Sequence, residues 1–278
     1  SAGERSSLET RPKAQALDAS LGKIVHITKA GKPVPGGPFA GVKNAKSLNP
    51  DFTALDVGPL GTLIGALGEV SFDQAVDYFK EVVVAGDKAG ADLIIIETMT
   101  DICEARAALI AAKEVSKLPV IVSMTYEENS RTLTGSDALT VVNILEGLGV
   151  DAIGINCSTG PDAMLPIITE LVRYASVPIM VEPNAGLPHM KDGKTVYDIS
   201  IDQFTDYMVQ IAEMGALILG GCCGTTPAYI AKMKEATRDL PLYQVSQKSF
   251  TAVSSSTRTI ILGADIHIIG ECINPTTN

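Results

Sequence analysis

Residues 91–98 read ADLIIIET, and this run of consecutive apolar residues ending in a polar pair decides the fold. A strand with one wet face alternates apolar and polar residues, whereas a parallel strand covered on both faces is apolar throughout. Five further runs share the pattern: FTALDV (52–57), PVIVSMTY (119–126), DAIGIN (151–156), VPIMVE (177–182) and ALILGG (216–221). The sequence therefore predicts parallel strands that are buried on both faces.

A turn and a helical pattern of roughly 12 to 18 residues follow each apolar run, as in βαβ units. The helices carry start signals, since Ser71–Gln74 and Ser200–Gln203 each fit a capping box and Pro227 follows Thr226. These units predict an α/β fold, a (β/α)8 TIM-type barrel that lacks its first two βα units and carries a short C-terminal extension. A doubly wound open sheet is the alternative.

The two ends of the chain differ from this central pattern. Before the first unit, only the run KIVHIT (23–28) reads as a strand, among charges, glycines and prolines. After the last helix, a Ser/Thr-rich stretch leads to another apolar run, ADIHIIGECINP. We expect four regions: an irregular or divergent segment at 1–50, the partial barrel at 51–240, a linker at 241–263 and the beginning of a further domain at 264–278.

Composition limits the classes of function. The chain has 278 residues, 46% of them apolar, and a formal net charge of -10, which suits a globular enzyme. No dense Lys/Arg stripe could neutralise a phosphate backbone, so nucleic acid is not expected as a partner. No apolar run approaches the ~20 residues that span a bilayer, and the polar opening lacks a signal-peptide core. We therefore expect a soluble cytoplasmic protein without a membrane partner.

Cysteines gather where two of the strands end. Cys157 follows DAIGIN, and Cys222 with Cys223 follows ALILGG, so three of the five cysteines fall at the rim where parallel barrels carry their reactive groups. Adjacent cysteines point to opposite faces within a strand, but the glycines of GGCCG let the backbone turn. Three sulfurs with one open position suit a catalytic zinc ion. A vicinal disulfide and plain packing are the alternatives.

The motifs around the strand ends resemble those of the homocysteine S-methyltransferase family over about residues 52–240. They are DVGPLGTL, ETMTD, MTYEENSRTLTG, GINCSTGP, VEPNAGLP and GGCCGTTP. The tail, FTAVSSSTRT followed by IIGECINPT, resembles the linker and opening strand of the pterin-binding domain in cobalamin-dependent methionine synthases. Cys272 stands where that pattern has arginine, a departure on the folate side.

The resemblance implies a set of roles. Cys157, Cys222 and Cys223 would hold Zn²⁺, whose open position takes the thiol of homocysteine. The methyl group would come from methylcobalamin on a separate module, with 5-methyltetrahydrofolate as its source, so cobalamin-binding and pterin-binding modules are expected partners. Glu97 would receive the amino group of homocysteine, although a rim glutamate is often only solvated. Asn184 would fill the fourth metal position when substrate is absent, although asparagine is also a common turn former.

Two rival functions remain open from the sequence. The methyl donor could be S-methylmethionine or betaine, against which the IIGECINPT tail argues. The chain could also be a non-catalytic zinc-binding remnant, because the family's first two strand–helix units, with an Asp-Gly-rich loop and a Thr-Asn-Thr loop, are not found in it. We therefore expect a fragment or damaged copy of a longer protein that is poor at catalysis alone.

Overall fold

The computed structural model describes residues 25–26, 37–65, 68–191, 193–263 and 266. Its main element is a parallel sheet of seven strands in the order β1-β9-β6-β5-β4-β3-β2. The strands are β1 (Val25–His26), β2 (Ala54–Val57), β3 (Leu93–Met99), β4 (Val120–Met124), β5 (Ala152–Asn156), β6 (Ile179–Glu182) and β9 (Ile218–Leu219). Every one of the six runs expected to form strands does so.

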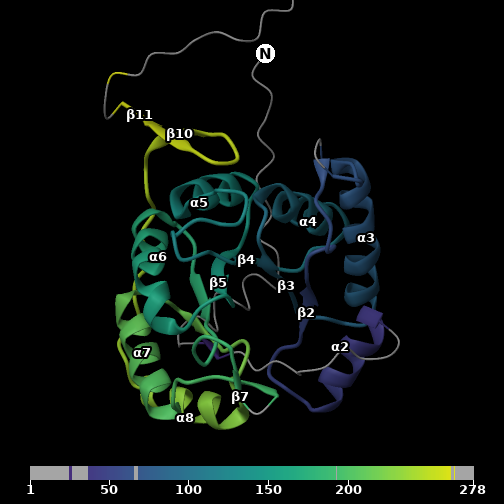
Figure 1. Cartoon of the computed structure of the whole chain (residues 1–278). Coiled ribbons are helices and arrows are strands. Elements are labelled where there is room, and N and C mark those ends of the chain that lie inside the picture. Colours follow the sequence, from purple (N-terminus) through teal and green to yellow (C-terminus); the bar gives the residue numbers. More distant parts are fainter. Residues whose placement is uncertain (1–24, 27–36, 66–67, 192, 264–265, 267–278) are drawn as a thin grey trace, which may run out of the picture.

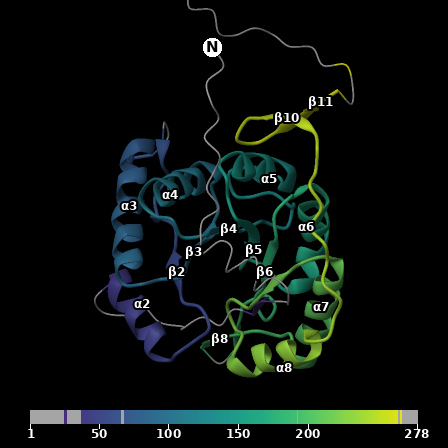
Figure 2. The same cartoon turned by 180° about the vertical axis from the view of Figure 1, so that it is seen from behind.

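Helices surround the sheet on its outer side (Figures 1 and 2). They are α2 (Gly37–Ser47), α3 (Phe72–Lys88), α4 (Ile102–Val115), α5 (Ala138–Gly147), α6 (Pro161–Tyr174), α7 (Ile201–Met214) and α8 (Pro227–Thr237). Both expected capping boxes are formed, at Ser71 before α3 and Ser200 before α7. No helix in the described part of the chain is both long and apolar enough to cross a membrane.

The strand order identifies the fold as part of a barrel. From β2 to β9 the strands lie side by side in chain order, whereas a doubly wound sheet reverses its order at a switch point. β1 adds a seventh strand beside β9, the place that the first strand takes when a barrel closes. Among the described strands none joins β1 to β2, so the barrel is open there, as the predicted partial barrel requires.

Two apolar layers explain why the strand sequences lack alternation. Ile94 and Ile96 of β3 belong to the large core between the sheet and the helices. Leu93 and Ile95 belong instead to a small cluster inside the curve of the sheet, together with Ile121, Ala152, Met180 and Ile218. Since successive strand residues face opposite sides, each strand is apolar on every residue wherever both layers exclude water.

The N-terminal segment contains a helix. Within the stretch 1–50, expected to be irregular or divergent, Gly37–Ser47 form helix α2. Apart from Gly41, the glycines and prolines that suggested irregularity precede the helix or lie in its first turn, where Pro38 needs no N–H partner. The expected start of a further domain at 264–278, including Cys272, lies outside the described residues apart from Ile266.

The expected linker at 241–263 contains ordered structure. Strands β10 (Thr251–Ser254) and β11 (Thr259–Leu262) pair antiparallel as a hairpin, which rests on α5 (Figure 1). Phe250, just before the hairpin, packs edge-on against Tyr174 at the end of α6 with ring centroids 6.2 Å apart. This segment is therefore a docked hairpin.

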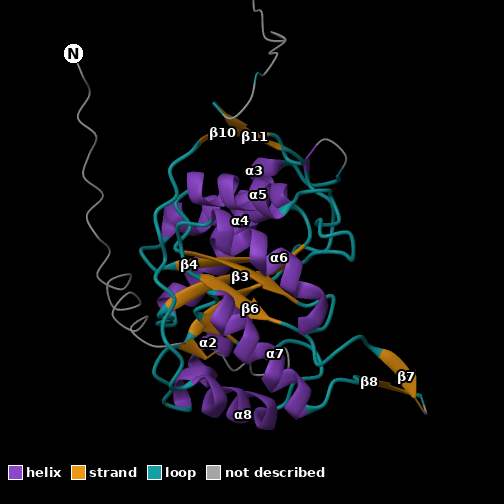
Figure 3. Ribbon diagram, turned by 90° about the vertical axis from the view of Figure 1, so that its left-hand side faces the viewer, coloured by secondary structure: helices purple, strands orange, loops and turns teal. Residues whose placement is uncertain are grey.

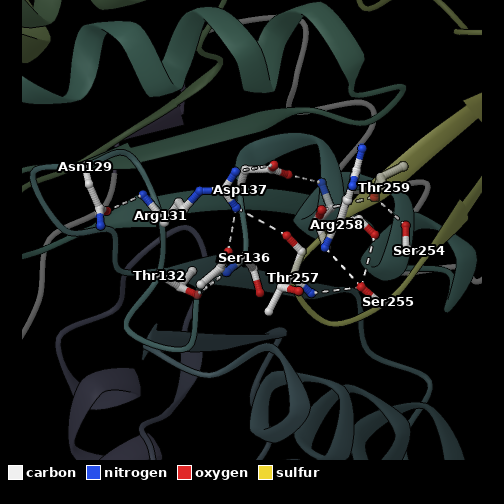
Figure 4. A network of polar contacts seen from close by, with 12 residues as sticks. Asn129, Arg131, Thr132, Ser136, Asp137, Ser254, Ser255, Thr257, Arg258 and Thr259 are labelled. Carbon is white, nitrogen blue, oxygen red and sulfur yellow. Dashed lines mark hydrogen bonds and ion pairs between the residues drawn. The ribbon is translucent and has the colours of Figure 1, made fainter.

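Hydrogen bonds fix the hairpin to α5 and to the loop that precedes this helix. They join Asn143 to Ser254, Ser136 to Ser256, Arg131 to Thr257 and Thr140 to Thr259. Figure 4 shows the turn of the hairpin against the β4–α5 loop. Because this loop starts at the carboxyl end of β4, the hairpin reaches the same rim of the barrel as the cysteines.

Removing one of these contacts should loosen the hairpin alone. Asn143→Ala deletes a 2.7 Å bond to the Ser254 hydroxyl, and a net loss of about 0.5–1.5 kcal/mol should speed tryptic cleavage after Arg258 about threefold to tenfold. Limited proteolysis followed by mass spectrometry measures the rate. Thr169→Ala, whose hydroxyl bonds only within α6, is the control and should cleave like the parent; equal rates for both variants would contradict the docking.

Candidate metal centre at the strand ends

The inner face of the sheet changes from apolar to polar toward the carboxyl ends of the strands. Toward the amino ends of the strands, this face carries the small apolar cluster that includes Ile95 and Ile121. Farther along the same strands, the residues of the same parity are Glu97, Ser123, Asn156 and Glu182, all at most 7% exposed. A buried polar layer is costly unless its groups are paired, so it points to a functional site at this end.

Cys157 directly follows β5, in a backbone turn for which the sequence carries no glycine at the turning residues. Cys157 and Ser158 both have a φ of 61°, a left-handed conformation that is uncommon outside glycine. The turn is held because Cys157 N–H donates to Glu182 O at 3.2 Å and Thr159 N–H donates to Cys157 O at 2.8 Å. Two successive left-handed residues redirect the chain just beyond the strand.

Cys222 and Cys223 lie past the end of β9, as the glycine-rich sequence predicts. Gly220 must lack a side chain, because a Cβ there would lie 2.6 Å from Glu182 Oε1. Gly224 has a φ of +81°, and a Cβ on it would meet the ring of Tyr197 at 2.4 Å. These two glycines allow the cysteine pair to leave the strand and face Cys157.

The three sulfurs converge. Sγ atoms of Cys157, Cys222 and Cys223 all lie within 4.8 Å of one another, and sulfurs around a tetrahedral zinc ion, at about 2.3 Å from it, lie about 3.8 Å apart. A hydrogen bond from Cys222 lowers the pKa of Cys157 to about 7, helped by the Ser158 N–H and opposed by burial. Burial and the Cys222 charge raise the pKa of Cys223. The donor set and its spacing fit zinc with one position left open.

Asn184 joins the loop after β6 to the cysteine loop. Its Oδ1 accepts from Cys223 N–H at 3.0 Å, its own N–H donates to Thr159 O at 3.2 Å, and Ala185 N–H donates to Cys223 O at 2.9 Å. The side chain is 3% exposed. Asn184 thus holds both cysteine-bearing loops together, and its expected place in the fourth metal position stays a prediction.

Glu97 sits on the inner face at the carboxyl end of β3. Pairing between β3 and β4 shifts register between Ile96 and Met99, and Thr98, next to Glu97, has a φ of 60°. Such irregularities re-aim side chains at barrel rims. The structure thereby directs Glu97 into the polar layer, while its role toward substrate stays a prediction.

Two neighbours of the cysteines were not predicted from the sequence. Tyr197 packs over Gly224, and its hydroxyl opposes the rise in the pKa of Cys223. Asn156 sends Nδ2 toward Cys222 Sγ at 3.9 Å. The position of Asn156 immediately before Cys157 was an available signal, whereas nothing in the sequence marks Tyr197, which follows the projecting hairpin of β7 (His189–Lys191) and β8 (Lys194–Val196) seen in Figure 3.

A cleft opens beside the Cys157 turn. It measures about 370 Å³ and is lined by Glu127, Glu128, Asn129, Ser158, Thr159 and Leu187. Ser158 and Thr159 continue directly from Cys157, so the cleft borders the turn that carries this cysteine.

The chain is similar to known proteins over most of its length. The profile of the family described as homocysteine S-methyltransferase matches residues 38–237. Methionine synthase of Mycobacterium tuberculosis is 33% identical over 226 residues, which are 78% of this chain and 19% of that protein. Methionine synthase of Mycobacterium leprae is 34% identical over 186 residues, 65% of this chain and 15% of that protein. The chain therefore spans about a fifth or less of the length of these relatives.

Solved structures resemble the fold. The metallated form of the homocysteine methyltransferase MmuM from Escherichia coli is 25% identical with a TM-score of 0.54, covering 83% of this chain and 77% of that one. The apo form of the same enzyme has a TM-score of 0.59 at 24% identity, covering 82% and 84%. The latter likeness concerns the fold alone.

Gly224→Ala should damage the cysteine loop selectively. The new methyl group meets both a left-handed φ and the Tyr197 ring, so zinc affinity should fall about tenfold or more, with about 1–2 kcal/mol of lost stability. Chelator competition and denaturant titration measure the two effects. Gly147→Ala, in α5 with nothing within 4 Å, is the control and should keep zinc affinity; an unaffected Gly224→Ala would show that the loop does not need this backbone conformation.

Proposed function

The chain belongs to the homocysteine S-methyltransferase family, and from this premise we propose that it binds zinc through Cys157, Cys222 and Cys223 and methylates homocysteine to methionine. The observation that carries the proposal is the convergence of the three sulfurs within 4.8 Å at the carboxyl ends of β5 and β9. Three protein ligands leave one tetrahedral position for a substrate sulfur, the arrangement of a catalytic rather than a structural site.

The chemistry asked of the site is activation of a thiol. A bound zinc ion would lower the pKa of the homocysteine thiol from its ordinary ~8.5, so that the nucleophilic thiolate exists at neutral pH. Cys157, with a pKa of about 7, is ready to be a ligand at neutral pH. Methyl transfer to a thiolate needs no general acid and base, so the proposal assigns no such role to the inward carboxylates of Glu97 and Glu182.

Glu97 is proposed to receive the ammonium group of homocysteine. Its carboxylate is 7% exposed and faces the polar interior, where an opposite charge is attracted more strongly than in water. Asn184 is proposed to occupy the fourth zinc position before substrate binds. Its bond to Cys223 N–H supports a place next to the metal and engages only part of the acceptor capacity of its amide oxygen.

We propose methylcobalamin as the immediate donor, carried by a module outside this chain and recharged from 5-methyltetrahydrofolate. Identity of 33% to a methionine synthase much longer than this chain supports that reading, as does the IIGECINPT tail. Residues 37–240 would then be the homocysteine-binding unit, the docked hairpin would lie in the connection, and the tail would begin a pterin-binding module.

Two other functions have some support. Likeness to MmuM over most of both chains favours a self-contained homocysteine methyltransferase that takes its methyl group from a small donor such as S-methylmethionine or betaine. The opening between β1 and β2 among the described strands favours a zinc-binding remnant without activity.

The function is tested with the zinc-loaded chain, homocysteine and each donor in turn. We expect one zinc per chain and methionine from methylcobalamin but not from S-methylmethionine or betaine. Loss of an outer-shell partner typically costs about 10–100-fold in metal affinity, so serine at any of the three ligand positions should cost more. Cys103→Ser, a cysteine in the first turn of α4, is the control. If the chain binds zinc but forms no methionine with any donor, the zinc-binding remnant is the function that survives. If the chain binds no zinc, the proposed metal site is refuted.

Glu97→Gln separates substrate binding from metal binding. Replacing the charged acceptor should weaken homocysteine binding about tenfold to a hundredfold, the effect of about 1.5–3 kcal/mol from one charged hydrogen bond, with zinc affinity unchanged. Isothermal titration of the zinc-loaded protein gives both constants. Glu213→Gln on the exposed face of α7 serves as the matched control, and equal homocysteine affinity in the two variants would remove Glu97 from the site.

A further inference from the structure

Asn156 is the most fully engaged polar side chain beside the cysteines. It ends β5, has no exposed surface, and makes four side-chain contacts. Its Oδ1 accepts from Thr98 N–H at 3.0 Å and from Ser123 Oγ at 2.8 Å. Its Nδ2 donates to Thr98 Oγ1 at 2.8 Å and points to Cys222 Sγ at 3.9 Å. A primary amide offers two donors and two acceptor positions, so its whole capacity is used.

These contacts leave the Asn156 amide a single orientation. A backbone N–H can only donate, so the atom facing Thr98 N must be the oxygen. The nitrogen is then the atom that faces the Thr98 hydroxyl and the Cys222 sulfur. Thr125 Oγ1 also donates to the backbone carbonyl of Asn156 at 3.1 Å, which holds the main chain in place as well.

The residues around Asn156 leave space for its hydrogen bonds. Ser123 is completely buried and reaches Asn156 across Gly154, where a Cβ would lie 2.9 Å from Ser123 Oγ. Thr98 keeps a left-handed φ of 60°, which is strained for a β-branched residue. The two hydrogen bonds between Thr98 and Asn156, one donated by each residue, stabilise Thr98 in that conformation, and Thr98 adjoins Glu97.

We propose that Asn156 is a positioning residue that ties the Glu97–Thr98 strand end to the sulfur of Cys222, so that the carboxylate and the metal ligands keep one geometry. The proposal rests on the proposed zinc site and deepens it. An N–H directed at a coordinating sulfur withdraws electron density from it and fixes its direction, as partners of metal ligands commonly do. The same amide restrains the backbone beside Glu97. One side chain therefore positions both a zinc ligand, Cys222, and the carboxylate proposed to bind the amino group of homocysteine.

Asn156→Asp is the decisive variant. The side chain keeps its size and its acceptor, but it loses both N–H donors and adds negative charge beside a thiolate. Zinc affinity should fall about 10–100-fold, homocysteine affinity should fall with it, and the sulfur-to-metal charge-transfer bands of the cobalt(II)-substituted protein should shift. Ser123→Ala is the matched control, since it removes a bond to the oxygen of the same amide and touches neither Thr98 nor Cys222.

The outcomes separate this inference from the zinc proposal. A parent chain that binds no zinc overturns both. A parent that binds zinc, with Asn156→Asp matching it in affinity and cobalt spectrum, overturns only the role of Asn156. Equal losses in Asn156→Asp and Ser123→Ala also overturn it, because a general packing defect would then suffice.

A measurement on the unchanged chain decides the matter if Asn156→Asp does not fold. In the protein loaded with an NMR-active cadmium isotope, one side-chain amide proton of Asn156 should show a scalar coupling to the metal through the sulfur. The Asn143 side-chain amide, which bonds to Ser254, is the internal control and should show none. A cadmium-bound protein without the Asn156 coupling overturns the proposal.

Discussion

Parallel pairing of β5, β6 and β9 is the constraint on which the site depends. Their registers align Asn156 with Glu182 and Val181 with Leu219, so the residues that follow each strand emerge at one edge. Cysteines 65 positions apart in sequence can then meet without a disulfide or any long excursion of the chain. The backbone bonds from Cys157 to Glu182 and from Cys222 to Pro183 lock the loops onto the shared frame of β6.

Much of this fold could be predicted from the sequence, because strands buried on both faces are apolar at successive residues. Runs such as LIIIE and VIVSM are typical of parallel strands that are covered on both faces. Helix α2 could not be predicted as easily, since the glycines and prolines around Pro38 argue for a loop. The hairpin was also missed: its turn, Ser255 to Arg258, lacks the Asn-Gly type of signal, and contacts with α5 more than 100 residues away stabilise it.

The candidate site divides in the same way. Cysteine is informative by its chemistry, so Cys157 and the Cys222–Cys223 pair were visible from residue type and strand position. Asn156 and Tyr197 were not, because their importance comes from what they contact. Asn156 acts on a residue 58 positions away, and a left-handed Thr98 is a property of the assembled rim that no local pattern records.

The hairpin packed against α5 affects where the C-terminal boundary of the barrel domain lies. The family profile ends at residue 237, yet Ser254 and Ser256 bond to α5 and to the loop that leads into it. Cutting the chain at residue 237 would expose the parts of α5 and of the β4–α5 loop that the hairpin covers. The structural unit is therefore longer than the part that the family profile matches, and it extends to about Leu262.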